Sequence, residues 1–253
     1  MKHGAENLVL WSDEALLAIN KPAGLPTLPD GYDLSAPYVR NLLEPEYGRL
    51  WIVHRLDKDT SGVLVLARSA QAHRSLNMQF DAHQAHKVYH ALVVGSPAWE
   101  ETSVEMPLRP DGDRRHRTVV DPERGKPALT ELRLLERFGD HSLVEASPRT
   151  GRTHQIRAHL AALGFPLAGD MLYGENRGIF PTELEPGYQC GSAGGGADSR
   201  AEGKAGERAL IQRPALHAWS LEVRHPLRDE PLRFEAPYPE DFAAALRQLR
   251  KHP

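Results

Sequence analysis

The chain has 253 residues, of which 40% are hydrophobic and 26% charged, and its formal net charge is −3. This composition excludes a collagen-like, coiled-coil or wholly disordered chain, and the length suits one large domain. No apolar run reaches the roughly 20 residues that a membrane helix needs. The single cysteine, Cys190, excludes an internal disulfide. We therefore expect a cytoplasmic protein that is not bound to a membrane.

The first third of the chain predicts short strands, a loop and two helices. Strands are expected at 9–10, 16–20, 50–53 and 63–67. Proline and glycine are so frequent in NKPAGLPTLPDGYD (20–33) that this segment predicts a loop. A short helix is expected at 36–43. Ser69 is a suitable N-cap for a second helix at 70–83, whose apolar residues recur every four positions.

The rest of the chain predicts more strands than helices. Strands are expected at 88–94, 129–136, 142–146 and 216–223, the second and third of them as a hairpin. Helices are expected at 153–163, where Gly164 ends the helix, and at 241–251. Residues 109–127 predict a long surface loop, and the Gly-rich residues 175–209 predict a flexible insertion. Many strands with few, unevenly spaced helices favour an α+β fold.

The segment HRLDKDTSGVLVLAR (54–68) places polar groups directly before a predicted buried strand. Turn formation is one interpretation, since Asp, Thr, Ser and Gly are turn formers whose side chains bond nearby backbone groups. Asp57 and Asp59 could also be paired oxygen ligands of a metal, although no further ligands follow at a matching spacing. The third interpretation is that one of these side chains takes part in a reaction.

The segment SPRTGRTHQIRAHLAALG (147–164) is cationic and contains no acidic residue. One interpretation is an ordinary helix whose acidic partners lie elsewhere in the sequence. The other is that Arg149, Arg152 and Arg157 hold phosphates or pair with a buried carboxylate. Residues 109–117 add four arginines. A basic face is therefore possible on a chain whose net charge is negative, although that net charge counts against a nucleic-acid binder.

Several common catalytic and metal-binding motifs are missing from the sequence. It contains neither H-E-x-x-H nor G-x-S-x-G, and the stretch GSAGGG lacks the lysine of a phosphate-binding loop. One cysteine cannot build a thiolate zinc site. Because Cys190 lies in the Gly-rich insertion, a Cys–His nucleophile is also disfavoured. The two polar segments described above remain the candidate sites.

Five segments together resemble the RluA-type pseudouridine synthases. HRLDKDTSGVLVLAR resembles the family motif H-R-L-D-x-x-T-S-G-x-L-x-x-A. GRTHQIRAHLAALGFPLAGDMLYG resembles the later motif G-R-T-H-Q-I-R-x-H-L…G-x-P-I-x-G-D-x-x-Y-G. HKVYHALVVG is similar to a strand between them, and LLAINKPAGLPTLP and LHAWSLEVRHPLRDEPLRFEAPYPEDF are similar to the opening and closing segments. The resemblance extends from about Val9 to Phe242, in the order of the family.

This resemblance implies the pseudouridine synthase fold, with a mixed, largely antiparallel central sheet, flanking helices and a cleft across the sheet. It implies isomerisation of specific uridines in RNA to pseudouridine, without a cofactor or a metal. Carried over by position, Asp57 is the catalytic aspartate and Arg157 is its basic partner. Tyr89 packs on the base and is a candidate for the proton transfer at C5. Arg55 enters the RNA stack when the target base flips out.

Further RNA contacts are assigned to His54, Arg149, Arg152 and Arg115. Because the chain begins almost directly with the catalytic motifs, we expect a single catalytic domain (1–253) without an S4-type RNA-binding domain. We expect it to act as a monomer with no obligate protein partner. The short form without an S4-type domain slightly favours tRNA, or a small stem-loop, over ribosomal RNA as the substrate.

Two other classes of protein use the same residues differently. A non-catalytic RNA-binding protein on this fold is expected to lack the aspartate, arginine or tyrosine of the catalytic set, and all three are present here. A metal-dependent hydrolase is expected to use Asp57 and Asp59 as ligands and to lose its activity in EDTA.

Overall fold

The computed structural model describes residues 8–29, 33, 35–174, 178–180 and 209–251. The predicted flexible insertion at 175–209 therefore lies outside the described residues, apart from 178–180 and 209. The chain forms two compact units. Unit 1 contains the residues up to His90 together with His217–Tyr238, and unit 2 contains Ala91–Leu216 and the residues from Pro239 onward. The chain leaves unit 1 and returns to it, and the prediction of a single domain stays a prediction.

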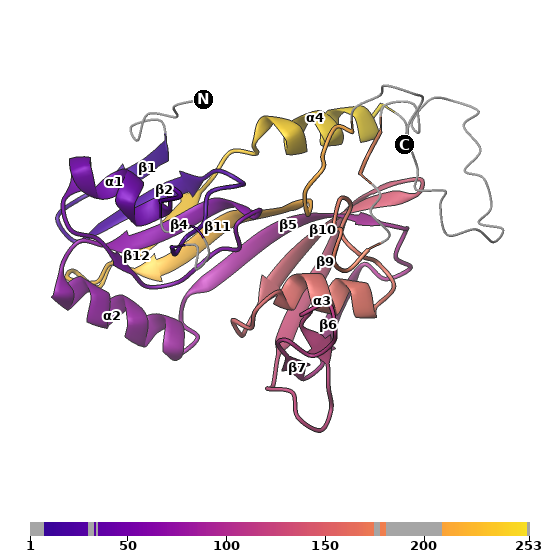
Figure 1. Cartoon of the computed structure of the whole chain (residues 1–253), viewed down its shortest axis with the longest axis horizontal. Helices are drawn as coiled ribbons and strands as arrows, with labels where there is room; N and C mark the ends of the chain where they lie inside the picture. Colours follow the sequence, from indigo (N-terminus) through magenta and orange to yellow (C-terminus); the bar gives the residue numbers. More distant parts are fainter. Residues whose placement is uncertain (1–7, 30–32, 34, 175–177, 181–208, 252–253) are drawn as a thin grey trace. The chain divides into compact units, whose positions relative to one another are not determined.

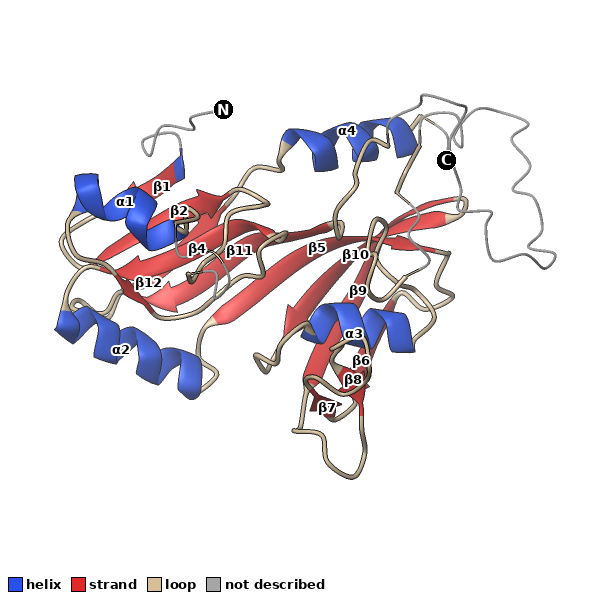
Figure 2. Ribbon diagram, in the orientation of Figure 1, coloured by secondary structure: helices blue, strands red, loops and turns tan. Residues whose placement is uncertain are grey.

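Four helices and twelve strands occur in the described part of the chain (Figures 1 and 2). Unit 1 holds β1 (Val9–Ser12), β2 (Leu16–Lys21), α1 (Val39–Tyr47), β3 (Trp51–Ile52), β4 (Ser61–Ala67), α2 (Ala70–Asp81) and β12 (Pro231–Glu235). Unit 2 holds β6 (Glu101–Glu105), β7 (Leu108–Arg109), β8 (Val119–Val120), β9 (Leu129–Phe138), β10 (His141–Pro148), α3 (Gln155–Ala162) and α4 (Glu240–Leu249). β5 (His86–Val94) and β11 (Leu216–Arg224) contribute residues to both units.

The core of unit 1 is built on β4, which is buried along its whole length. Successive side chains of a strand point to opposite faces of the sheet, so β4 supplies two cores. Val63, Val65 and Ala67 pack in the cluster that includes residues of α2. Leu64 and Leu66 pack in the cluster that includes residues of α1. The two helices therefore cover opposite faces of this sheet, as Figure 1 also shows.

Strand pairing in unit 1 fixes the start of β4 between two neighbours. β2 pairs with β4 antiparallel, from Leu16 opposite Ala67 to Lys21 opposite Gly62. β11 pairs with β4 in parallel, with His217 opposite Ser61. β1 continues the sheet beyond β2, β3 pairs with β4, and β12 pairs with β11. The start of β4, where the polar segment meets the sheet, is thus held by strands on both sides.

Unit 2 is organised around the hairpin of β9 and β10, which pair antiparallel from Thr130 opposite Pro148 to Phe138 opposite His141. β6 pairs with the other edge of β9, and β7 and β8 form a small separate pair. α3 contacts β8, β9 and β10. This arrangement brings α3, which lies within the cationic segment, beside the β7–β8 pair.

The predicted fold class is confirmed: the chain is α+β, and its strand pairs are largely antiparallel with β4–β11 parallel. The predicted hairpin at 129–146 and the four predicted helices are present, and the Ser69 hydroxyl accepts from the Ala72 N–H at the start of α2. The prediction of a long surface loop at 109–127 is wrong in part, because Arg109 of β7 and all of β8 lie inside this range and the two strands pair. None of the helices in the described part of the chain is both long and apolar enough to span a bilayer.

Candidate active site

In unit 1, Asp57 lies in a tight turn between β3 and β4. The N–H of Thr60 donates to the carbonyl of Asp57 at 3.1 Å, which closes the turn. The side chains of this segment divide sharply by exposure: Leu56, Thr60 and Ser61 are buried, whereas Arg55 is exposed and Asp57 is half-buried. We call residues 54–61 the Asp57 turn. Its apolar and hydroxyl side chains anchor it to the core, and its charged side chains lie toward solvent.

The end of the Asp57 turn is fixed against β11. The Nε2 of His217 lies 3.0 Å from the carbonyl of Ala236, so this nitrogen carries the proton. The Nδ1 of His217 then accepts from the hydroxyl of Ser61 at 2.9 Å. Gly62 follows with φ +114°, and a Cβ at this position would lie 2.1 Å from the carbonyl oxygen of Ala218. Only glycine permits this close approach. Together with the bond from Ser61 to His217, it fixes the register of the turn against β11.

Tyr89 and Lys87 face this turn from β5, on which residues two apart share a face. Tyr89 packs against the apolar cluster that contains Leu56. Burial raises the pKa of Tyr89 above its ordinary value, and the negative charge of Asp57 raises it further. Burial also lowers the pKa of Lys87. Tyr89 therefore lies within range of the charge of Asp57, and the tyrosine is a neutral phenol at physiological pH.

His54, which is half-buried, has a structural role at the start of the same turn. Its Nε2 accepts from the backbone N–H of Val65 at 3.0 Å, and its ring stacks on Phe80 with the ring centroids 4.6 Å apart. Burial, with a smaller contribution from the charge of Lys87, lowers the pKa of His54 to about 3. The ring is therefore neutral and fixes the turn to β4. The predicted contact of His54 with RNA stays a prediction.

In unit 2, Arg157 of α3 forms a buried ion pair. Its Nε and Nη2 donate to the two carboxylate oxygens of Asp170 at 2.7 and 2.8 Å, and both side chains are at least nine-tenths buried. The guanidinium also lies over the ring of Tyr173, 4.9 Å from its centroid. One oxygen of Asp170 accepts from the N–H groups of Leu172 and Tyr173 as well. The alternative of a buried carboxylate partner is therefore confirmed for Arg157.

The other three arginines that were predicted to contact RNA belong to unit 2 and lie at its surface or just below it. Arg149 is exposed and pairs with Glu131 at 2.7 Å. Arg152 donates to the carbonyl of Pro127, and the exposed Arg115 donates to the carbonyl of Met171. These bonds leave the cationic side chains at or near solvent, where a polyanion can reach them. Their contact with RNA, and the pairing of Arg157 with Asp57, stay predictions.

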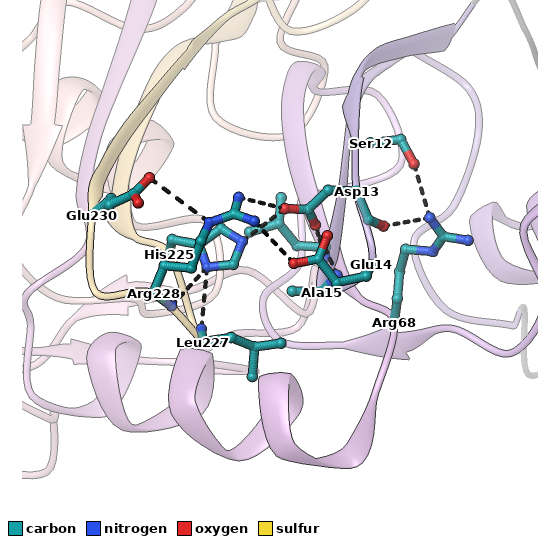
Figure 3. A network of polar contacts seen from close by, with 10 residues as sticks. Ser12, Asp13, Glu14, Ala15, Arg68, His225, Leu227, Arg228 and Glu230 are labelled. Atoms are coloured by element: carbon teal, nitrogen blue, oxygen red, sulfur yellow. Dashed lines mark hydrogen bonds and ion pairs between the residues drawn. The ribbon is translucent and has the colours of Figure 1, made fainter.

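A third cluster of polar side chains lies in unit 1 near β1 and the β11–β12 hairpin (Figure 3). Asp13, Glu14 and His225 are placed closely enough to hold a metal ion. Their groups already have partners: Asp13 accepts from the Nε2 of His225 at 2.7 Å and from Arg228 at 2.9 Å, and Glu14 also accepts from Arg228. Arg228 stands where a cation would bind, so the cluster is an ion-pair network that ties the hairpin to β1.

Two residues of the site were not singled out from the sequence. Lys87 shares a strand face with Tyr89, and the period of two along HKVYHALVVG is the signal that could have found it. Asp170 lies within the motif that was quoted, but its pairing with Arg157 spans 13 positions and needs the three-dimensional fold. In both cases the sequence shows the residue, but it does not show which residues lie beside it in the fold.

Comparisons with known proteins show the family of this chain. The family model described as RNA pseudouridylate synthase matches residues 15–162. The "Ribosomal large subunit pseudouridine synthase D" of Xylella fastidiosa is 39% identical over 248 residues, which cover 96% of this chain and 69% of that protein. An "Uncharacterized RNA pseudouridine synthase" of Chloroflexus aurantiacus is 39% identical over 238 residues, 91% of this chain and 66% of that protein.

A solved structure agrees as well. "Human RNA Pseudouridylate Synthase Domain Containing 4" has a TM-score of 0.72 and 27% identity, and the match covers 97% of this chain and 94% of that one. The chain belongs to the RNA pseudouridylate synthase family. Within that family it is of the RluA type, and it is an isomerase that acts on RNA.

Proposed function

We propose that this enzyme converts a specific uridine of large-subunit ribosomal RNA to pseudouridine, with Asp57 as the essential side chain. The observation that supports the assignment is that Tyr89 packs in the apolar cluster of Leu56, the residue before Asp57, within range of the charge of Asp57. A carboxylate and a neutral phenol beside each other supply a nucleophile or base and a proton carrier. Few purely structural roles need both groups at the end of a strand.

The reaction requires that the bond between C1′ and N1 of the uridine break and that a bond between C1′ and C5 form. Asp57 divides this into easier steps, either as a nucleophile or as a base at the sugar. The detached uracil turns within the site and bonds through C5. The proton leaves C5 and N1 gains one, so the product has the same mass as the substrate. Tyr89 is proposed to stack on the base and to carry the C5 proton as a neutral phenol.

Base flipping is assigned to Arg55. A stacked base is inaccessible, so the target nucleotide must leave the helix and a side chain must fill its place. Arg55 is exposed and directly precedes the buried Leu56, so its backbone is anchored while its side chain can reach the RNA. Its neighbour His54 is bonded to the N–H of Val65, and we assign it to holding Arg55 in place as well as to the proposed RNA contact.

Arg157 is proposed to set the charge state and direction of Asp57. A guanidinium beside a carboxylate favours its ionised form and fixes its direction through charge-assisted hydrogen bonds. Asp170 holds Arg157 through Nε and Nη2. Arg115, Arg149 and Arg152 are assigned to phosphates of the RNA, since each is a cationic side chain at or near the surface of unit 2.

The RNA class is assigned from the relatives. Proteins named for the large ribosomal subunit are 35–39% identical to this chain over most of its length. The preference for tRNA that the sequence suggested rests on the short form alone, so ribosomal RNA is the stronger assignment and tRNA the alternative. The enzyme is proposed to act as a cytoplasmic monomer, since each proposed catalytic residue belongs to this one chain.

The experiment is tritium release from RNA that carries 5-tritiated uridine. Fragments of large-subunit RNA and a set of transcribed tRNAs are incubated separately with the enzyme. Release from a ribosomal fragment, with none from the tRNAs, is the expected result. Release from tRNA alone contradicts the assignment of the substrate but not that of the reaction. Binding to native RNA without any release contradicts the reaction and favours a non-catalytic RNA-binding protein.

A further inference from the structure

The hydroxyl of Thr27 holds both backbone groups of the residue that precedes Asp57. Its Oγ1 donates to the carbonyl of Leu56 at 2.8 Å and accepts from the N–H of Leu56 at 3.2 Å. Thr27 and Leu56 are 3% and 4% exposed, so water does not compete for these bonds. One side chain, 29 positions away in the sequence, thus replaces the strand partner that Leu56 would have in a sheet.

The residue that follows Asp57 is held from the same segment. The carbonyl of Lys58 accepts from the Nζ of Lys21 at 3.0 Å and from the N–H of Gly24 at 2.9 Å. Lys21 is fully buried, and its Nζ also donates to the carbonyls of Pro22 and Leu25 at 2.9 and 2.8 Å. These bonds give the loop that ends at Thr27 a single shape. The loop is therefore a rigid support for the Asp57 turn.

Asp57 itself is only half-buried, and its position depends on the backbone on either side of it. The two peptide units that flank its Cα are those whose carbonyls belong to Leu56 and Asp57, and the first of them is fixed by Thr27. The second is fixed by the bond from Thr60 to the carbonyl of Asp57. If the first bond is lost, the peptide before Asp57 can rotate, and the carboxylate turns with it.

We propose that Thr27 is a positioning residue that sets the direction of the Asp57 carboxylate through the backbone of Leu56. This inference rests on the proposed role of Asp57. Thr27 acts through the backbone of Leu56 and is assigned no contact with the RNA. Its loss is expected to slow the chemical step and to leave RNA affinity unchanged. A displacement of about 1 Å at a catalytic group is enough to reduce a rate by roughly 100-fold.

The test compares Thr27→Val, which keeps the shape and removes the hydroxyl, with Thr27→Ser, which keeps the hydroxyl. Single-turnover rates at saturating enzyme and dissociation constants for the same RNA are measured on folded protein. The expected result is a rate that falls between about 10-fold and 100-fold in Thr27→Val, with the dissociation constant within twofold of wild type. Thr27→Ser is expected to retain most of the rate. If Thr27→Val does not fold, Thr27→Ala, which places no methyl group against Leu56, carries the same prediction.

A matched control separates positioning from general stability. Ser142 is a buried hydroxyl of unit 2 that donates to the carbonyl of Gly95 at 2.9 Å. Ser142→Ala is expected to lower the melting temperature without changing the single-turnover rate. A Thr27→Val rate within twofold of wild type, while wild type is active and Asp57→Asn is not, overturns the positioning role and leaves the proposed function intact.

Hydrogen exchange of the Asp57 turn gives a reading that does not depend on activity. Amides of residues 54–61 are expected to exchange at least about tenfold faster in Thr27→Val than in wild type or Thr27→Ser. If wild type releases no tritium from any RNA, the proposed function fails, and the exchange rates still decide the role of Thr27. Equal exchange in Thr27→Val and wild type contradicts it.

Discussion

Asp57 and Arg157, the two charged residues proposed for catalysis, are held in different ways within their own units. Asp57 in unit 1 lies in a turn whose backbone is fixed by bonds that end on the peptide groups of Leu56, Asp57 and Lys58. Arg157 in unit 2 depends on its side chain, which a buried carboxylate, that of Asp170, holds at two points. A side chain can be substituted with little loss in the free energy of unfolding when the bonds that hold its segment end on backbone groups. A group held by a buried ion pair cannot.

The largest effect on stability is expected at the buried pair. Asp170→Asn keeps an oxygen for the N–H groups of Leu172 and Tyr173 but leaves the charge of Arg157 without its partner. Removing one member of a buried pair destabilises a protein by about 3–5 kcal/mol. Urea denaturation at pH 7 measures the change in the free energy of unfolding. A loss below about 1 kcal/mol contradicts the view that this pair fixes unit 2.

A smaller effect is expected from His54 as the pH falls. The folded protein keeps His54 neutral down to about pH 3, whereas the unfolded chain binds a proton near pH 6.5. The stabilising contribution is therefore complete above pH 6.5 and is lost as the pH falls toward 3. Between pH 7 and pH 5 the loss amounts to about 2 kcal/mol.

The matched variant is His54→Gln, which keeps an acceptor for the N–H of Val65 and binds no proton. Denaturation curves of both proteins at pH 7 and pH 5 give the two pH dependences. The loss between these pH values is expected to be smaller in His54→Gln by about 2 kcal/mol. Equal pH dependences in the two proteins contradict a neutral His54.

The smallest effect is expected at the exposed pair of Arg149 and Glu131. Both side chains are almost half exposed, so water screens the charges. Glu131→Gln is expected to change the free energy of unfolding by about 0–1 kcal/mol, which makes it the control for Asp170→Asn. Removing an acidic neighbour of Arg149 also favours a polyanion, so RNA affinity is expected to rise slightly in filter binding at low salt. Weaker binding contradicts the assignment of Arg149 to RNA.

Much of the fold was predictable because its signals are local. The buried run of β4, the Ser69 cap of α2 and the hairpin of β9 and β10 each follow from residues close in sequence. β8 was missed because its two residues lie in a charged, Pro/Gly-rich stretch and are a strand only by pairing with β7. The short strands β6 and β12 were missed for the same reason: they are strands because they pair with β9 and β11, respectively.

The sequence predicted the candidate catalytic residues but not the residues that hold them in position. The motif resemblance pointed to Asp57 and Tyr89, and in the structure the charge of Asp57 reaches Tyr89 and raises its pKa. Thr27 lies in a segment whose prolines and glycine predict only a loop, and nothing local shows that its hydroxyl reaches Leu56. The partner of Arg157 was foreseen as a buried carboxylate but not as Asp170. Tertiary hydrogen bonds between distant positions leave no periodic signal in the sequence.

Single-turnover tritium release by wild type and Asp57→Asn tests the central claim most directly. The substitution removes the charge and the basicity of the carboxylate while its shape is kept, and the half-buried position makes a large loss of stability unexpected. The rate on the RNA that wild type modifies is expected to fall at least about 1,000-fold, with RNA affinity within a few-fold of wild type. An Asp57→Asn protein that releases tritium at a rate close to wild type contradicts the assignment of Asp57 as the essential side chain.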